Sequence, residues 1–268
     1  MRRMPGIVPG LAALLFLASC STPSGEVDGE PAESTAGDPD DALFQFRLVE
    51  DWGHSYPSMA DGESIPECAP AEADGEEAST VEEVWDKVGP EAAELAQSLT
   101  YPMYEGYHAR PLLEFCDLTP REAQLLPADV LWNVPHVTCD HLTGAPREVA
   151  PDEPLVTCLG EGHKGSDDRL LLRPALFDRN GVNDVYIVPQ EKGDYSVEII
   201  LNEEAAEALT GLIEDNAVNP QTRTAFVIDG IAVATPVVFE PMGEVLFIRE
   251  DYTEEEALAM VDLLNGEA

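Results

Sequence analysis

Basic residues are scarce in this chain of 268 residues: 14 lysines and arginines stand against 53 aspartates and glutamates, a formal net charge of −39. Only Lys87, Lys164 and Lys192 are lysines. A surface this acidic repels the phosphates of nucleic acids and the headgroups of anionic lipids. The composition therefore excludes nucleic acid as a direct ligand and requires any membrane attachment to come from another feature of the chain.

Sequence signatures of catalysis are also lacking. The chain has no G-x-S-x-G nucleophile elbow, no P-loop, no H-E-x-x-H zinc motif and no D-x-D-x-D-G calcium loop. Neighbouring acids such as Asp167 and Asp168 are expected by chance in so acidic a chain. We therefore expect a protein that is not an enzyme and that uses no cofactor.

Long apolar runs are missing after Leu17, since no later stretch of 18 apolar residues could form a membrane-spanning helix. Before that point, Arg2 and Arg3 precede a short apolar run from Ile7 to Leu17, and small residues follow it. This order is typical of a secretory signal peptide over residues 1–19.

The signal region ends in Leu17-Ala18-Ser19-Cys20, which resembles the lipobox of bacterial lipoproteins. The resemblance implies cleavage before Cys20, acylation of its thiol, and a mature chain anchored by lipid on the extracytoplasmic face of the cell membrane. An ordinary signal peptide followed by a chance cysteine is the alternative. Removal of residues 1–19 would take away Arg2 and Arg3 and leave a formal charge of −41.

Four further cysteines follow Cys20, and an even number in an exported chain predicts two disulfides with three possible connectivities. We favour Cys139–Cys158, which closes a compact proline-rich loop and leaves Cys68–Cys116 as the second pair. Metal ligands of suitable types do occur together in His136-Val137-Thr138-Cys139-Asp140-His141, with His163 nearby. A disulfide at Cys139 would remove the thiolate, so we expect no metal site.

By composition the chain divides into four parts, of which the signal peptide at residues 1–19 is the first. Residues 20–42 have little to bury and are expected to form a disordered linker. Residues 43–154 predict a strand at 43–49 and then helices that begin at the capping pairs Ser79 with Glu82 and Thr119 with Glu122. Residues 155–268 are more regular.

The C-terminal part alternates strands and helices. Strands are predicted at 170–172, 185–188, 195–201, 224–228, 231–238 and 245–249, and Asp229-Gly230 is a strong hairpin turn. Asn202 and Thr253 are expected to cap helices at about 203–214 and 254–264. The order of elements predicts an α+β fold with helices on one face of an antiparallel sheet.

Several of these segments resemble the periplasmic P1 region of SecD, a membrane subunit of the protein-export machinery. Residues 224–236, 252–257 and 263–266 resemble its head subdomain, and Phe46-Arg47-Leu48-Val49 is similar to the F-R-x-V strand of the family. Residues 152–158 and 171–174 are similar to actinobacterial SecD. The resemblance implies a ferredoxin-like head preceded by a disulfide-stapled helical and loop region. Because the intramembrane polar residues of the family have no counterpart, it implies no proton-driven motor.

Taken together, these features predict a non-catalytic extracytoplasmic module that binds exported polypeptides or components of the Sec translocon. The candidate contact residues are Tyr101, Tyr104, Tyr107, Phe239, Pro241 and Met242. Core packing is the alternative for the tyrosines, and a plain turn for the other three. A lipoprotein module for envelope assembly with one fixed protein partner is the competing function, and a small-ligand carrier is a third. The sequence leaves the oligomeric state open.

Overall fold

A computed structural model describes residues 44–54, 68–72, 77–103, 110–160, 168–190, 193–215, 222–238 and 243–265. All of them belong to one unit of the chain, Asp40–Ala268. The expected signal peptide, the linker and Cys20 lie outside the described residues. Within the part described, no helix is both long and apolar enough to cross a membrane.

The larger sheet has the strand order β2-β3-β1-β6-β7, and all of its ladders are antiparallel. Its strands are β1 (Phe44–His54), β2 (Leu155–Cys158), β3 (Asp168–Asp178), β6 (Thr222–Ile228) and β7 (Ile231–Ala234), and a short β8 (Val237–Val238) also pairs with β6.

This sheet curls toward itself. Three register shifts between β1 and β3 bend the ladder. A parallel bridge joins Leu159, just after β2, to Ala232 of β7. The Gly160 N–H also donates to the Ala232 carbonyl at 2.9 Å. The concave side therefore encloses a small apolar core that contains Val49, Leu172 and Val227.

The smaller sheet has the order β4-β5-β9, again antiparallel, and consists of β4 (Val182–Pro189), β5 (Tyr195–Leu201) and β9 (Val245–Tyr252). Helices α6 (Glu203–Asp215) and α7 (Glu254–Asn265) contribute to the same core as these strands. Phe44, Phe46 and Phe226 of the larger sheet complete that core, which is the largest among the described residues.

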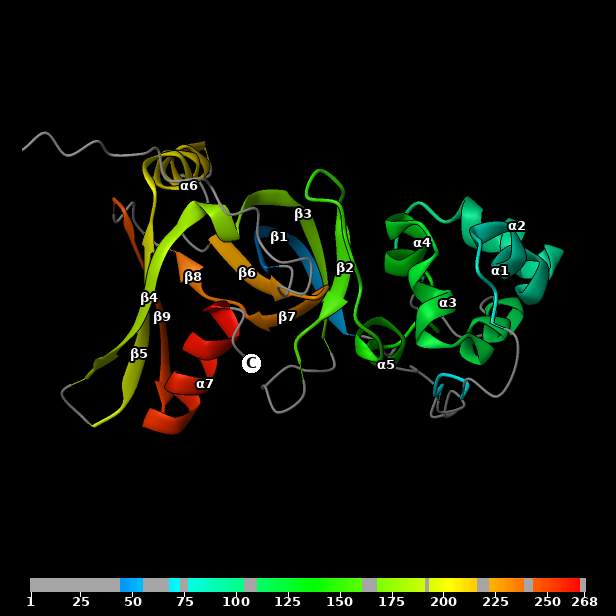
Figure 1. The fold of residues 1–268 in the computed structure, drawn as a ribbon. Helices are drawn as coiled ribbons and strands as arrows, with labels where there is room; N and C mark the ends of the chain where they lie inside the picture. Colours follow the sequence, from blue (N-terminus) through cyan, green and yellow to red (C-terminus); the bar gives the residue numbers. More distant parts are fainter. Residues whose placement is uncertain are drawn as a thin grey trace, which may run out of the picture. The chain divides into compact units, whose positions relative to one another are not determined.

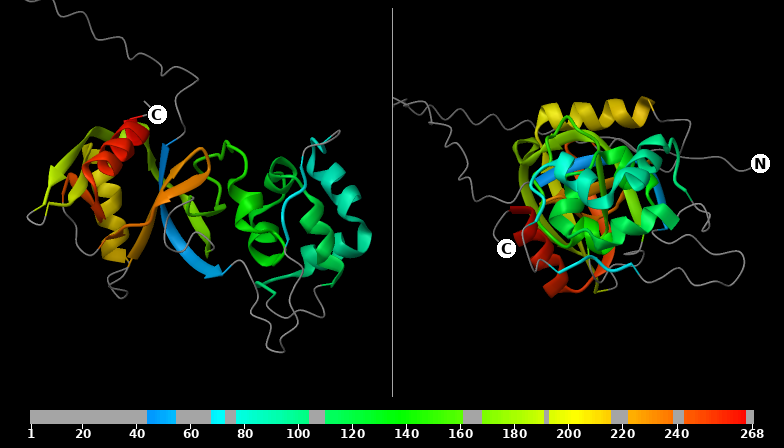
Figure 2. Two further views of the ribbon diagram at one scale, coloured as in Figure 1. Left: turned by 90° about the horizontal axis from the view of Figure 1, so that it is seen from below. Right: turned by 90° about the vertical axis from the view of Figure 1, so that its right-hand side faces the viewer.

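The remaining helices form a region with its own core, in which Leu112, Phe115 and Leu131 are fully buried. Figures 1 and 2 show these helices gathered on the side of the larger sheet opposite to α6 and α7. They are α1 (Val81–Val88), α2 (Pro90–Ser98), the 3-10 helix η1 (Arg110–Asp117), α3 (Pro120–Gln124), α4 (Ala128–Asn133) and α5 (Cys139–Thr143).

The α+β class and the antiparallel pairing of its strands are confirmed, but the strands divide between two sheets. Strand β1 comes from the part of the sequence assigned to the N-terminal region, and it lies between β3 and β6 from the C-terminal part. The boundary at residue 154 stays a prediction. The pairing of β1 was not predictable from its own residues, because its partners are far away in the sequence.

Most predicted helix starts are confirmed. Thr119 and Glu122 form a complete capping box, and Thr253 exchanges hydrogen bonds with Glu256. Asn202 accepts from the Ala205 N–H at 2.9 Å. The box at Ser79 is wrong by one residue: Thr80 accepts from the Glu83 N–H at 3.2 Å, while the Glu83 carboxylate accepts from the Ser79 N–H. Thr80 and Glu83 have the same spacing, and helix α1 starts at Val81.

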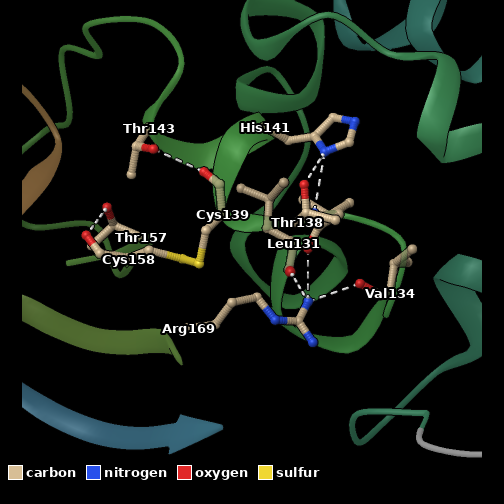
Figure 3. Close-up of a disulfide and its surroundings, with 10 residues drawn as sticks. Leu131, Val134, Thr138, Cys139, His141, Thr143, Thr157, Cys158 and Arg169 are labelled. Atoms are coloured by element: carbon tan, nitrogen blue, oxygen red, sulfur yellow. Dashed lines mark hydrogen bonds between the residues drawn. A yellow bond between two sulfur atoms is a disulfide. The ribbon is translucent and has the colours of Figure 1, made fainter. Parts of the chain in front are cut away.

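Both favoured disulfides are confirmed. Cys68 is joined to Cys116, and Cys139 to Cys158. The second bond ties α5 of the helical region to the end of β2 (Figure 3). Beside it, Arg169 of β3 is buried and its Nη1 donates to the carbonyls of Leu131 and Val134 at 3.0 and 2.8 Å. Helix α4 thus has its C-terminal carbonyls satisfied by a side chain from the sheet.

Arg47 performs the same function inside the sheet region and has no exposed surface. Its guanidinium donates to the carbonyls of Glu153, Arg173 and Ala150 at 2.6, 3.0 and 3.1 Å, and to the Gln45 side chain at 2.8 Å. Burial, together with the nearby Arg147, lowers the pKa of Arg47 to about 10. The group therefore stays charged at neutral pH and holds the segment before β2 against β1 and β3.

We predict that Arg47→Met lowers the free energy of unfolding by about 3 kcal/mol or more, because it leaves buried carbonyls without donors. The midpoint of urea unfolding measures this loss. Arg173→Met is the matched control, since Arg173 is half exposed and reaches Glu50 only at 3.8 Å. Equal midpoints for the two variants would contradict the role given to Arg47.

Candidate polypeptide-binding surface

The contact residues predicted from the sequence do not form one surface within the described residues. Tyr101 follows α2 and is 72 % exposed, whereas Phe115, from the same aromatic-rich stretch, is fully buried. Tyr104, Tyr107, Phe239, Pro241, Met242 and Cys20 lie outside the described residues. Tyr101 therefore remains a single exposed ring, and a binding surface has to be built from other side chains.

The β4-β5-β9 sheet has one face that is fully used by the core. Val185, Val197, Ile199, Leu246 and Ile248 point to this face and are buried. Residues of α6 and α7 belong to the same apolar cluster. In Figure 1 both helices and the larger sheet lie on this side of the three strands.

The opposite face carries apolar side chains that no described element covers. Side chains alternate between the two faces of a strand, so the neighbours of the buried residues point outward. The register places Tyr186, Glu198 and Phe247 in one row across the sheet, and Ile200 beside Val245 in the next. Tyr186 is exposed, and the other four are partly exposed. We call these five residues, with Val188 of β4, the outer face.

The outer face is acidic as well as apolar. The Tyr186 hydroxyl donates to the Glu198 carboxylate at 2.9 Å, and this hydrogen bond raises the pKa of Tyr186. At the start of β5, beside the core and not on the outer face, the nearby Glu254 carboxylate raises the pKa of Tyr195, whose hydroxyl donates to it at 3.3 Å. Both phenols remain protonated donors at neutral pH. None of the described side chains on this face is basic.

Strand β4 also presents an open backbone edge. Among the described strands it pairs only with β5, over Val182 to Pro189. The other side of β4 pairs with no described strand, and the addition of a strand to such an edge is a common mode of peptide recognition. Two of its peptide groups already have partners, since the Val185 N–H donates to the Asp184 carboxylate and the Val182 carbonyl accepts from Arg179. A register shift near Asp184 and the proline at position 189 limit the open stretch at both ends. An extended polypeptide paired there would lie beside Tyr186 and Val188.

Sequence reasoning missed this surface, although the alternation needed to find it is present. Tyr186 and Val188 alternate with Val185 and Ile187, and Glu198 and Ile200 alternate with Val197 and Ile199. Alternating apolar residues on both faces are also typical of a strand buried on two sides. The pattern alone does not distinguish an open face from a covered one.

The histidine and cysteine cluster of the helical region is structural in the described residues. Cys139 is in a disulfide, and Thr138 Oγ1 lies 2.8 Å from His141 Nδ1. His136 is 5 % exposed, and its Nδ1 has no hydrogen-bond partner among the residues that the structure describes. Burial, with a smaller effect of Arg169, lowers the pKa of His136 to about 4. Within the described part of the chain, no three histidine, cysteine or acidic side chains come together as a metal site.

No family model matches the chain, and no curated protein matches it. Solved structures of SecDF are similar at low TM-scores. One, SecDF in its super-membrane-facing form, is 15 % identical with a TM-score of 0.34 and is matched over 85 % of this chain and 19 % of its own. A second, described as a membrane component that enhances protein export, is 16 % identical at 0.35, over 85 % and 64 %.

A third structure, SecDF from Thermus thermophilus, is 24 % identical with a TM-score of 0.31 and is matched over 39 % of this chain and 14 % of its own. The chain thus spans less than two thirds of each of these proteins. They belong to the family that the sequence resembles, and at such scores the likeness carries no conclusion about what the chain binds.

The buried His136 predicts a loss of stability in mild acid. Its folded pKa lies below the unfolded value, so the unfolded chain binds the proton first and the free energy of unfolding falls as pH drops from about 6.5 toward 4. At pH 5 the cost is about 2 kcal/mol. His136→Leu should reduce the fall measured between pH 7 and pH 5 by about this amount. An unchanged pH dependence would contradict the assignment.

Proposed function

We propose that this chain is a non-catalytic binding module, held by lipid at the extracytoplasmic face of the membrane, that binds exported polypeptides in an extended conformation. The observation that carries the proposal is the open edge of β4 beside the outer face. Backbone hydrogen bonds at such an edge give affinity that does not depend on the sequence of the bound chain, whereas specificity in this mode comes from pockets for alternate side chains. The sequence-independent affinity suits binding of many different polypeptides before they fold.

The charge of the module supports the same role. The described outer face has Glu198 and no basic group, and the whole chain is strongly acidic. Such a surface favours neutral or basic segments and repels acidic ones. It also keeps the module away from anionic lipid headgroups, so that attachment at Cys20 would set its distance from the membrane. We propose that the segment 21–42 serves as the spacer.

Residues 46–49 and 224–236 resemble SecD in sequence, and on that ground we propose a location near the Sec translocon, without a motor function. A single fixed protein partner in envelope assembly is the alternative. The two differ in what binds at β4, since a carrier of exported chains meets many sequences and an assembly module meets one.

Replacing tyrosine 186 by the photocrosslinker benzoylphenylalanine tests the binding surface. Tyr186 is 39 % exposed on the outer face, and Leu258 of α7 is 45 % exposed on the far side of that helix from the core and serves as the control position. Irradiation of membranes during export should give a spread of adducts with newly exported chains at position 186 and few at 258. One adduct of constant mass would favour the fixed partner, and no adduct at 186 would contradict both.

Cys20→Ala tests the anchor. Without the thiol no acyl chain can be attached, and the module should move from the membrane fraction to the soluble extracytoplasmic fraction, as measured by immunoblotting after fractionation. Unchanged membrane association of the variant, with no loss of label from radioactive palmitate, would show that Cys20 is not acylated.

A further inference from the structure

A groove of about 690 Å³ lies between the helical region and the segment that leads into β2. Val81 of α1, Leu125 and Pro127 between α3 and α4, and Pro146 and Pro154 contribute apolar wall. Arg147 also lines the groove. The groove is separate from the outer face, because none of its lining residues belongs to β4, β5 or β9.

The backbone of Arg147 is fixed by the hairpin between β6 and β7. Its N–H donates to the Asp229 carbonyl at 2.9 Å. A Cβ atom at Gly230 would lie only 2.8 Å from the Cβ of Arg147, so the turn and the arginine are in close contact. The side chain therefore starts from a rigid position at the wall of the groove.

Arg147 is partly buried, and among the described residues its guanidinium lacks the carbonyl partners that the buried Arg47 and Arg169 have. Its Nη1 atom is buried, and no hydrogen bond or ion pair of the side chain is found among the described residues. Burial lowers its pKa, and the nearby Glu153 carboxylate acts in the opposite direction. An unsatisfied charged donor below the surface is costly, and a ligand with an acceptor oxygen would remove that cost.

Arg47 and Arg169 indicate which acceptor fits. Both donate to main-chain carbonyls, three each. We propose that the groove binds an extended apolar polypeptide segment and that Arg147 donates to a main-chain carbonyl or to the terminal carboxylate of that segment. A free inorganic anion fits less well, because Glu148 and Glu153 also line the groove and much of its wall is apolar.

This inference rests on the proposed function, since it assumes that polypeptides are the ligands. It assigns them a second site, which is tested by peptide binding and not by crosslinking at position 186. A short peptide of leucine, proline and alanine is the probe. Its prolines lack the N–H groups that pairing with β4 requires, so it reports on the groove and not on the edge. It is labelled with fluorescein and prepared with a free and with an amidated C-terminus.

Binding to the full chain is measured by fluorescence anisotropy. Arg147→Gln should weaken binding about tenfold, as expected for loss of a charged hydrogen bond. Arg121→Gln removes the same charge from an exposed position on α3 outside the groove and should leave the affinity unchanged. Ala128→Trp fills the groove without altering Arg147 and should also weaken binding. If Arg147→Gln loses affinity equally for both peptides, the group that accepts from Arg147 is a main-chain carbonyl. If the variant loses affinity only for the peptide with the free C-terminus, that group is the terminal carboxylate.

Equal affinity of the unaltered chain and Arg147→Gln would overturn the proposal, as would failure of the unaltered chain to bind either peptide. Thermal melting shows whether Arg147→Gln is folded. If that variant is unfolded, Ala128→Trp becomes the deciding variant, and peptide binding that Ala128→Trp retains overturns the proposal. Crosslinks at position 186 that persist while the peptides fail to bind would leave the proposed function standing. Loss of those crosslinks with peptide binding intact would remove the β4 site and leave the groove.

Discussion

Burial of arginine against main-chain carbonyls is the interaction on which the rest of this structure depends. Arg47 joins the irregular segment before β2 to the larger sheet, and Arg169 joins the end of α4 to β3. In each case the guanidinium donates several hydrogen bonds to main-chain carbonyls of other segments. The fork geometry and weak hydration of arginine suit this use, whereas lysine would offer a point charge that is costly to desolvate.

The burial of arginine side chains also affects the charge of the surface. A protein with few basic residues places some of them in its interior, so the exposed surface is more acidic than the composition alone indicates. One of the three lysines is also engaged, because Lys87 donates at 2.6 Å to Glu122, which is 1 % exposed. Burial alone would raise the pKa of Glu122, but Lys87 and the N–H groups of Thr119 and Ala78 hold it below its usual value. Few cations therefore remain to attract anionic partners.

Local features were predictable from the sequence, and long-range ones were not. A capping box such as Thr119 with Glu122 involves residues only three positions apart, so the sequence shows it directly. The same holds for the turn at Asp229-Gly230, where both residues have positive φ. The division of the strands between two sheets depends on pairs such as Phe46 with Phe226, and no local pattern specifies them. The partners of Arg47 were hidden for the same reason. Its motif was recognisable, but an arginine in a strand is ordinarily read as exposed.

The open edge of β4 raises the question of why two copies of the module would not simply pair there. Two β4 strands in antiparallel contact would bring the Asp184 carboxylates of both copies onto neighbouring strands, with each Glu198 one strand further away. Like charges that lie opposite each other on neighbouring strands are destabilising. The net charge of the whole chain adds repulsion at longer range. A neutral or basic segment meets no such penalty. Under the proposed function, these acidic side chains would leave the edge open to a neutral or basic polypeptide and would disfavour pairing with a second copy.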